Sequence, residues 1–288
     1  MTHVPVLLQE VIDGLALRPG DDAIDCTYGC GGYTNAMLAA SAPDGRVLGI
    51  DRDTSVHAAS VDQRLVLVHA NFDHIGALAA AYGYVTPRAI VADLGFSSLQ
   101  VFEPSRGFSF QHDGPLDMRY NTTGNEQTAA DLIANLPMIE IERIIRLYGE
   151  DRHARVIAAV IIEERRHRRI ETTQQLVDVI QRALPKRGRI HPATRTFQAL
   201  RIAVNDELGA LERAIPQMIE LVQEGGRIAI VSFHSLEDRI VKQVFRAAED
   251  QRCGVRITKR PLQPSEQEIE HNPRSRSAKL RIFEKQSS

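Results

Sequence analysis

The chain of 288 residues is 43% hydrophobic and 25% charged, with a formal net charge of −2, which is typical of a globular protein with one large or two smaller domains. No apolar run is long enough to span a bilayer, and the first residues lack the basic and apolar regions of a signal peptide, so we expect neither a membrane-spanning nor a secreted protein. Three cysteines are too few for a disulfide framework, and we therefore expect a reducing, cytoplasmic location.

The first hundred residues alternate short apolar strands with helical segments. A short amphipathic helix is expected at 10–15, before turn residues at 18–20. Strands are expected at 24–25, 47–51, 64–70 and 89–95. Because these strands are almost entirely apolar, they favour a parallel sheet that is buried on both faces.

Between residues 105 and 205 the strand pattern is replaced by helical periodicity. After a polar loop, helices are expected at 128–135, 139–147, 152–165, 173–184 and 194–204. Another helix at 206–223 precedes a strand at 227–233 and a pair of strands at 254–259 and 278–285, which a long polar loop separates. We therefore predict an α/β domain in two parts, 1–104 and 206–288, with a helical insertion at 105–205.

The stretch 24–34 predicts a strand, a glycine turn and a helix. Gly31 and Gly32 let the backbone pass close to a ligand, and the helix presents unpaired N–H groups and a positive dipole end to the same space. A dinucleotide fingerprint needs a third glycine where this chain has Thr34. S-adenosylmethionine fits better, because its carboxylate suits the turn amides and its cationic groups suit an acid such as Asp25. A dinucleotide and a purely structural turn remain as alternatives.

In an open α/β sheet, ligands bind beyond the carboxyl ends of the strands. The predicted strand ends carry Asp25, Asp51, Phe72, Asp93 and the pair Phe233-His234. Asp51 is placed to hold ribose hydroxyls, with a helix cap as the alternative. Phe72 either covers an adenine face or packs in the core. Asp93 precedes a turn with two hydroxyls, Ser97 and Ser98, which suits the sulfonium end of the donor.

Two other kinds of site are not supported. Cys26 and Cys30 have a spacing compatible with metal binding, but no Cys/His cluster supplies further ligands, so we expect no metal site. His234, Ser235 and Asp238 have the residue types of a hydrolytic triad, but the glycines of a nucleophile elbow are missing. We expect Ser235 to cap the next helix, with Asp238 as the acid of a capping box.

Positive charge is concentrated in the helical segment. Between residues 152 and 201 there are twelve Lys and Arg against four Asp and Glu. Two basic clusters lie there, at 165–169 and 186–189, and they predict either contacts with RNA phosphates or a solvated helix face. Aromatic residues make up 5% of the chain and Trp is absent, so broad base-stacking platforms are not expected.

Taken together, these stretches resemble the RsmH (MraW) family of methyltransferases, and the resemblance extends nearly from end to end. The matching stretches are 3–7; 24–34 with Asp51; 93–98 with Gln100; 106–110 with 113–119; and 191–202 with 232–239 and 273–281. The resemblance implies a class I S-adenosylmethionine-dependent methyltransferase, with a Rossmann-like, mainly parallel seven-stranded sheet and an inserted helical domain for substrate recognition. It also implies the exocyclic N4 amine of a cytidine in 16S ribosomal RNA as the acceptor, within the assembled small ribosomal subunit.

Carried over residue by residue, the resemblance implies cofactor contacts at Gly31, Gly32, Tyr33, Asp51, Phe72, Asp93 and Gln100. Tyr33 and Phe96 depart from the family, which often has a histidine and a small aliphatic residue there. Candidates for orienting the amine, stabilising its developing charge and accepting its proton are Asp93, Ser97, Ser98, Asp117 and His234. The alternatives from other classes are a nicotinamide oxidoreductase and a methyltransferase-like RNA-binding protein without activity. The sequence leaves the oligomeric state open, a homodimer included.

Overall fold

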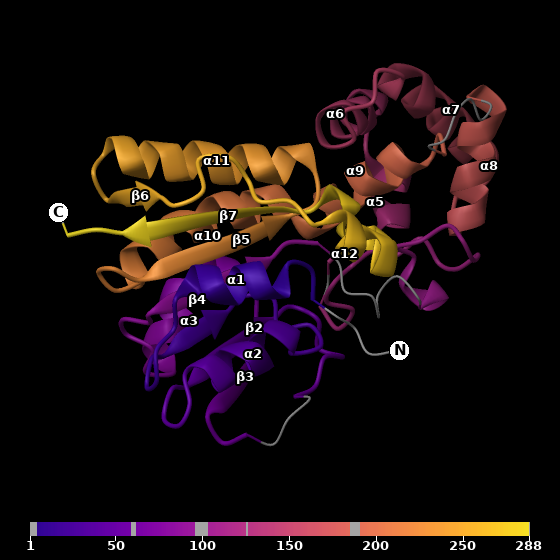
Figure 1. The fold of residues 1–288 in the computed structure, drawn as a ribbon. Helices are drawn as coiled ribbons and strands as arrows, with labels where there is room; N and C mark the ends of the chain where they lie inside the picture. Colours follow the sequence, from indigo (N-terminus) through magenta and orange to yellow (C-terminus); the bar gives the residue numbers. More distant parts are fainter. Residues whose placement is uncertain (1–4, 59–61, 96–102, 125, 185–190, 288) are drawn as a thin grey trace. The chain divides into compact units, whose positions relative to one another are not determined.

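The computed structural model describes residues 5–58, 62–95, 103–124, 126–184 and 191–287 (Figure 1). Contacts within the chain divide it into two compact units. Residues 1–95 and 208–288 form unit 1, and residues 96–207 form unit 2. Among the described residues, no helix is long and apolar enough to cross a membrane. The role of segment 105–205 in substrate recognition stays a prediction.

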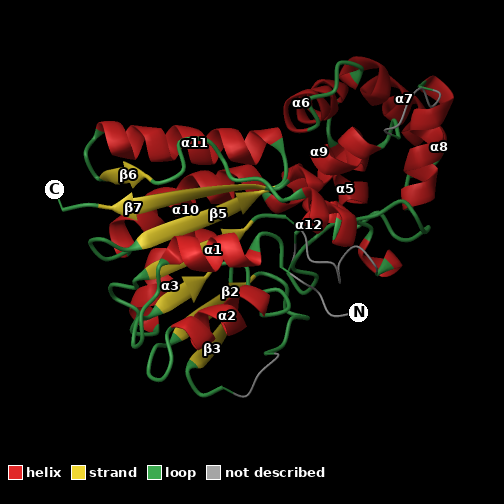
Figure 2. Cartoon of the chain, in the orientation of Figure 1, coloured by secondary structure: helices red, strands yellow, loops and turns green. Residues whose placement is uncertain are grey.

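Unit 1 is built on a seven-stranded sheet with the strand order β3-β2-β1-β4-β5-β7-β6 (Figure 2). The strands are β1 (Ala23–Asp25), β2 (Val47–Asp51), β3 (Leu65–His69), β4 (Ala89–Asp93), β5 (Arg227–Ser232), β6 (Gly254–Arg256) and β7 (Lys279–Lys285). The first five run parallel, whereas β7 is antiparallel to both β5 and β6. The predicted strands and the mainly parallel, seven-stranded α/β sheet are confirmed.

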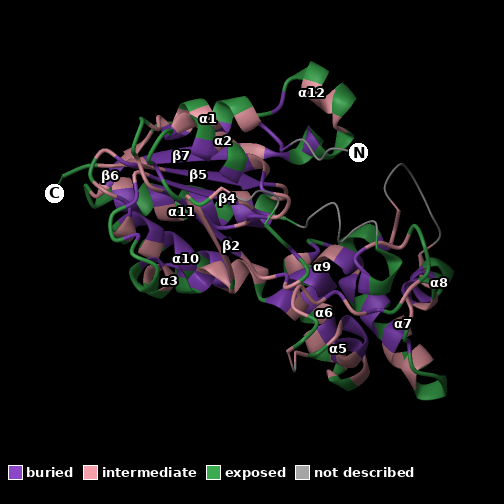
Figure 3. Ribbon diagram, turned by 90° about the horizontal axis from the view of Figure 1, so that it is seen from below, coloured by how far each residue is buried: buried purple, intermediate pink, exposed green. Residues whose placement is uncertain are grey.

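Helices cover both faces of this sheet. They are α1 (Leu8–Leu15), α2 (Gly32–Ala40), α3 (Ile75–Ala81), α10 (Glu207–Leu221) and α11 (Ser235–Asp250). The first residue of α10, Glu207, is the last residue of unit 2. The short helix α12 (Glu266–His271) has no buried residue and lies outside both cores. One hydrophobic cluster joins α1 and α2 to strand residues such as Ala23 and Val47. The other joins α3, α10 and α11 to their neighbours Ile24 and Leu48. Alternate strand residues therefore face two separate cores, which explains why the inner strands β1, β2, β4 and β5 are buried and apolar along almost their whole length, whereas the edge strand β3 is only partly buried (Figure 3).

Unit 2 is helical along the part of it that the structure describes. Its helices are α5 (Ala129–Asn135), α6 (Met138–Tyr148), α7 (Ala154–His167), α8 (Thr173–Ala183) and α9 (Thr194–Asn205). They enclose a hydrophobic core of their own. Capping boxes begin two of them, Thr128 with Asp131 at α5 and Thr172 with Gln175 at α8. The five helices predicted between 128 and 204 are confirmed, each within two residues at either end.

The segment 261–277 of unit 1 differs from expectation. The sequence pattern predicts a polar loop there, but the segment contains α12 and a 3-10 helix at Pro273–Ser277. α12 forms because the Ser265 hydroxyl caps its amino terminus and accepts the Glu268 N–H at 3.1 Å. None of its residues is buried, so no apolar periodicity indicates the helix.

The cap of α11 also differs from the prediction. The N-cap is His234, whose ring Nδ1 accepts the Glu237 N–H at 3.4 Å, while the Glu237 carboxylate accepts the His234 N–H at 3.3 Å. The assignment of Ser235 and Asp238 to a capping box is therefore wrong. Asp238 instead accepts a hydrogen bond from Arg281 of β7 at 2.7 Å, because the helix turns this carboxylate toward the neighbouring antiparallel strand.

Candidate cofactor site and active site

The strand order of unit 1 brings the predicted carboxylates to one edge of the sheet. β2 lies on one side of β1 and β4 on the other, so the chain changes direction between β1 and β4. Open α/β sheets bind ligands beyond the carboxyl ends of strands at such a switch point. Asp25, Asp51 and Asp93 are the last residues of β1, β2 and β4. All three therefore lie at the position where a ligand is expected.

The turn between β1 and α2 depends on its glycines for two different reasons. Gly31 is the N-cap of α2 with φ of +76°, and a Cβ there would also lie 2.7 Å from the Tyr28 hydroxyl. A Cβ on Gly32 would lie 2.2 Å from the Pro5 ring, so this glycine admits a neighbouring segment of the protein. No side chain of the described residues caps α2, which leaves the first-turn amides of this helix available to a ligand.

Asp25 lies under the glycine turn and fixes its shape. This carboxylate is completely buried, and it accepts hydrogen bonds from the Thr27 N–H at 3.1 Å and the Thr34 hydroxyl at 2.7 Å. Burial raises the pKa of Asp25 to about 6. Thr34, which replaces the third glycine of a dinucleotide fingerprint, therefore has a defined role as the partner of this buried acid.

Asp51 joins the end of β2 to the same turn. Its carboxylate accepts the Gly29 N–H at 2.7 Å and the Asp53 N–H at 2.8 Å. Residues 52–58 form no helix, so the helix-cap alternative has no support in the described part of this loop. Burial raises the pKa of Asp51. Each carboxylate oxygen accepts one backbone hydrogen bond and retains a second lone pair, which is what a pair of ribose hydroxyls requires.

Two aromatic candidates lie near these acids in different settings. Phe72 begins a 3-10 helix after β3 and packs, half-buried, against the core cluster that contains α3. Tyr33 is buried and donates its hydroxyl hydrogen to the Val6 carbonyl. The ring of Tyr33 is thus engaged inside the protein, and a cofactor contact through its backbone stays a prediction.

Asp93 is a candidate whose carboxylate is buried without its full set of hydrogen bonds. Its N–H donates to the Thr27 hydroxyl at 2.7 Å, which fixes the end of β4 against the glycine turn. Its carboxylate Oδ1 is buried and has no hydrogen-bond partner among the described residues. Burial, together with the charges of Asp25 and Glu237, holds the pKa of Asp93 well above the usual carboxyl range. A cation or an N–H donor placed here would relieve that unfavourable environment.

His234 follows β5 at the neighbouring strand end, and it is engaged with Glu237. Its Nδ1 accepts the Glu237 N–H, and its Nε2 lies 3.1 Å from Glu237 Oε1 without the geometry of a hydrogen bond. The buried Glu237 carboxylate also accepts the Phe233 N–H at 2.8 Å. These contacts give His234 a structural role in capping α11, and its part in proton transfer stays a prediction.

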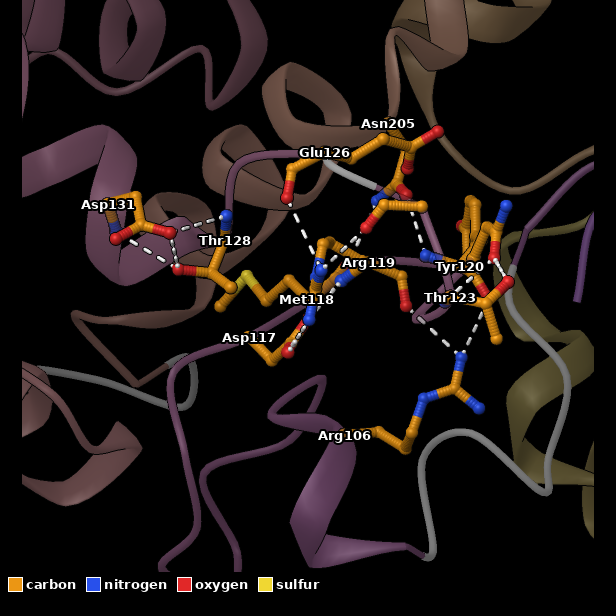
Figure 4. A network of polar contacts seen from close by, with 12 residues as sticks. Arg106, Asp117, Met118, Arg119, Tyr120, Thr123, Glu126, Thr128, Asp131 and Asn205 are labelled. Atoms are coloured by element: carbon orange, nitrogen blue, oxygen red, sulfur yellow. Dashed lines mark hydrogen bonds and ion pairs between the residues drawn. The ribbon is translucent and has the colours of Figure 1, made fainter.

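Asp117 belongs to unit 2, where it forms part of a polar network (Figure 4). Its two carboxylate oxygens accept hydrogen bonds from Nε and Nη2 of Arg119, both at 2.8 Å. This bidentate pairing holds Asp117 in the loop before α5, and a catalytic role for it stays a prediction. The remaining candidates, Ser97, Ser98 and Gln100, lie outside the described residues, as does Phe96.

The basic cluster at the end of α7 makes contacts within its own unit. Arg165 Nη1 donates to the Ile133 and Leu136 carbonyls at the end of α5, both at 2.7 Å. The remaining arginines of the cluster form ion pairs with nearby carboxylates: Arg166 with Glu163, Arg168 with Glu164 and Arg169 with Asp131. These contacts favour a solvated helix face over an RNA-binding patch at 165–169. The cluster at 186–189 lies outside the described residues.

Sequence reasoning missed two residues that shape the site. Thr27 holds the ends of β1 and β4 together, because its hydroxyl accepts the Asp93 N–H. Its position two residues after Asp25, at the end of a strand, could have indicated this role. Glu237 was overlooked because Ser235 and Asp238 also have capping-box spacing, although His234 and Glu237 have the same spacing one residue earlier.

Comparisons with known proteins agree on one family. The model of the MraW methylase family matches residues 1–286. A protein of Symbiobacterium thermophilum named Ribosomal RNA small subunit methyltransferase H is 46% identical, over 98% of this chain and 96% of that protein. A protein of the same name from Citrifermentans bemidjiense is also 46% identical, over 98% of both chains. The crystal structure of an rRNA methylase from Streptococcus thermophilus aligns over 99% of this chain and 100% of its own, with a TM-score of 0.46 and 13% identity, a likeness too distant to add to the others.

Proposed function

Because the chain belongs to the MraW methylase family, we propose that it methylates RNA of the small ribosomal subunit at the exocyclic N4 amine of a cytidine. The methyl donor is S-adenosylmethionine. Relatives that are 46% identical over almost their whole length carry the name of a small-subunit ribosomal RNA methyltransferase, which supports the acceptor molecule. The choice of the N4 amine rests on the family resemblance, and the acidic strand end at Asp93 is compatible with an amine acceptor.

The observation that carries this proposal is the buried, unpaired oxygen of Asp93. A buried carboxylate oxygen without a partner among the described residues is costly in a structure that needs it for stability alone. A sulfonium cation and an amine with N–H donors both supply what this oxygen lacks. Asp25, Asp51 and the glycine turn beside it suit the other parts of the donor, so the residues present fit S-adenosylmethionine.

Asp93 has the central role in the mechanism we propose. When bound, the donor would supply a methyl group on a sulfonium centre. The lone pair of an exocyclic cytosine amine is delocalised into the ring, so the amine is a poor nucleophile until it is turned and held. Asp93 accepts a hydrogen bond from this amine, directs its lone pair toward the methyl group and stabilises the positive charge that develops on nitrogen. The nitrogen then loses a proton, for which Asp93 is the first acceptor.

The remaining cofactor contacts divide between backbone and side chains. We assign the methionine carboxylate of the donor to the first-turn amides of α2 at Gly32 and Tyr33, and the ribose hydroxyls to Asp51. Phe72 is assigned to the adenine face, and Gln100 keeps the contact that the family resemblance implies. Ser97 and Ser98 are proposed to help orient the amine, with Asp117 and His234 as further candidates.

The setting of the reaction follows from the acceptor. We propose that the protein works in the cytoplasm on the assembled small subunit, and that segment 105–205 recognises the RNA around the target. The target nucleotide has to leave any base stack to reach the donor. A homodimer is compatible with these assignments, because none of them uses a second copy of the chain.

The test is the transfer of labelled methyl from S-adenosylmethionine to small subunits that lack the modification, with nucleoside analysis of the digested RNA. We expect N4-methylcytidine at a single site, and weaker labelling of protein-free 16S RNA. The matched control is Asp51→Asn, which should weaken donor binding roughly tenfold and leave the labelled nucleoside unchanged. Bound donor without any label on the RNA would contradict the proposed acceptor and would favour an RNA-binding protein without activity.

A further inference from the structure

Unit 1 contains a polar pocket that is lined in part by the candidate His234 and whose cationic residues the proposed chemistry does not use. Its volume is about 330 Å³, and it lies between the turn that joins β5 to α11 and the segment that precedes β7. Its polar lining includes Ser235, Gln263, Arg276, Ser277 and Lys279. None of the side chains that line it is a carboxylate. Two cationic side chains with hydroxyl and amide donors around them form a lining suited to an anion.

The charges around this pocket do not cancel. Arg276 is exposed and makes no hydrogen bond or ion pair with any described residue. Lys279 Nζ lies 3.4 Å from Asp238 Oδ2, but Asp238 Oδ1 is already bonded to Arg281 Nε at 2.7 Å. One carboxylate therefore faces two cations of β7 while Arg276 stands unpaired beside them. The pocket has an excess of positive charge at its rim.

The pocket lies next to the proposed reaction centre, on the side away from the glycine turn. In the strand order β1-β4-β5, the glycine turn follows β1 and the pocket lies at the end of β5. β4, which ends in Asp93, lies between these two strands. Gly95 lies two residues after Asp93, and a Cβ at Gly95 would lie 3.2 Å from the ring of Phe233, which lines the pocket. Asp93 pairs with Val231 of β5, and Phe233 lies two residues beyond Val231. One strand spacing and two residues along the strand therefore separate Asp93 from Phe233, a distance of roughly 10 Å. A group bound in the pocket is therefore a neighbour of the reacting nucleotide and not a part of the donor.

We propose that this pocket binds a backbone phosphate of the RNA strand beside the methylated nucleotide, with Arg276 and Lys279 as its cationic ligands. This inference rests on the proposed function and names a positioning contact for it. Phosphate contacts fix the register of a strand without reading its sequence. A phosphate held beside Asp93 fixes one side of the target nucleotide while its base turns out of the stack.

The test compares Arg276→Gln, Lys279→Gln and the double variant with wild-type protein. Arg246→Gln is the matched control, because Arg246 is an exposed cation on α11 that does not line the pocket. Binding to unmodified small subunits is measured between about 50 and 300 mM salt, with S-adenosylhomocysteine in place of the donor. We expect the double variant to bind roughly tenfold more weakly at low salt, and the slope of log affinity against log salt to fall by about 0.7 for each lost contact.

A charge-conserving substitution and a donor-binding measurement distinguish a phosphate site from a structural cation and from a donor site. Arg276→Lys keeps the charge and should recover most of the affinity. A slope in both pocket variants equal to that of Arg246→Gln overturns the inference. So does weaker binding of S-adenosylmethionine to Arg276→Gln with an unchanged salt slope, since this would assign the pocket to the donor carboxylate. Because binding is measured without methyl transfer, absence of N4-methylcytidine would contradict the proposed function alone.

Discussion

Two regions of the molecule bury charged and polar side chains. The hydrogen-bonding groups of these side chains have partners to different degrees in the two regions. In unit 2, Asn205 at the end of α9 holds the loop before α5. The Asn205 side chain accepts the Tyr120 N–H at 2.8 Å and donates to the Met118 carbonyl at 2.7 Å. Arg106 donates to the Arg119 and Tyr120 carbonyls at 3.1 and 2.9 Å. Most polar groups of this network have partners inside the network (Figure 4). It is built to hold a loop in one shape, including the positive φ of 64° at Met118.

At the strand ends of unit 1 the same kinds of residue are left short of partners. Asp93 has a buried oxygen with no partner among the described residues, and burial together with two neighbouring acids raises its pKa. Asp93 and the loop residues Arg106, Met118 and Arg119 belong to stretches that carry the family resemblance, so the sequence marks both regions. The difference lies in hydrogen bonding. A network whose members mostly bond to one another stabilises the fold, even though the atoms Arg106 Nε and Glu126 Oε2 make no hydrogen bond to the described residues. An unsatisfied buried carboxylate at a strand end, where ligands bind in open α/β sheets, indicates a place where a ligand completes the structure.

The largest effect is expected from Asp93→Asn. The amide keeps the size of the side chain but loses the charge, so methyl transfer should fall about 10³-fold, equivalent to about 4 kcal/mol in the barrier. The free energy of unfolding without donor should stay the same or rise at pH 7, because a neutral amide avoids the cost of a buried charge. Asp250→Asn, at an exposed end of α11, is the control for both measurements. A lower free energy of unfolding for Asp93→Asn would show that Asp93 stabilises the fold, as the acids of unit 2 do, and would contradict the proposed difference between the two regions.

The opposite pattern, a loss of stability without a loss of donor binding, is expected from Asn205→Ala in the unit 2 network. The substitution leaves the Tyr120 N–H and the Met118 carbonyl without their partner, at a cost of about 2–4 kcal/mol in unit 2. Urea unfolding and hydrogen exchange of unit 2 amides report this loss, while donor binding to unit 1 should be unchanged. Asn135→Ala, an exposed residue at the end of α5, should cost less than about 0.5 kcal/mol. Equal stability of the two variants would show that the network is not what holds the loop.

A smaller effect is expected from pH, through Asp25. Its folded pKa of about 6 lies above the value of 3.8 for a free carboxyl, so ionising it opposes folding. Without donor, the contribution of Asp25 to stability should therefore fall as pH rises from about 4 to 6 and stay constant above that range. Donor affinity should change in the other direction, rising by up to about tenfold per pH unit below 6, because the cationic donor favours the ionised acid. Asp25→Asn should make both curves less steep between pH 5 and 7. Asp51 and Asp93 are the other acids that we propose to face the donor. If the pH dependence of stability and of donor affinity were the same in Asp25→Asn as in the wild type, the titration would belong to Asp51 and Asp93.

Much of this architecture was predictable from short stretches of sequence. The strands are recognisable because alternate residues face two apolar cores, and the helices of unit 2 because their apolar residues recur at helical spacing. The positions of Asp25, Asp51 and Asp93 at strand ends followed from the same pattern. α12 was missed because none of its residues is buried, and the cap of α11 was misassigned by one residue because two overlapping boxes share one spacing.

The sequence by itself determined the sheet, the helical segment, the family and the acids at the strand ends, since each is encoded in residues that are neighbours along the chain. Only the tertiary structure decided which of those acids is satisfied. Asp117 finds its partner two residues away in Arg119, whereas the surroundings of Asp93 come from β1, β5 and the start of α11. The pocket with Arg276 likewise joins segments about forty residues apart. Hydrogen bonding and burial depend on which distant segments the fold brings together, and local sequence does not contain that information.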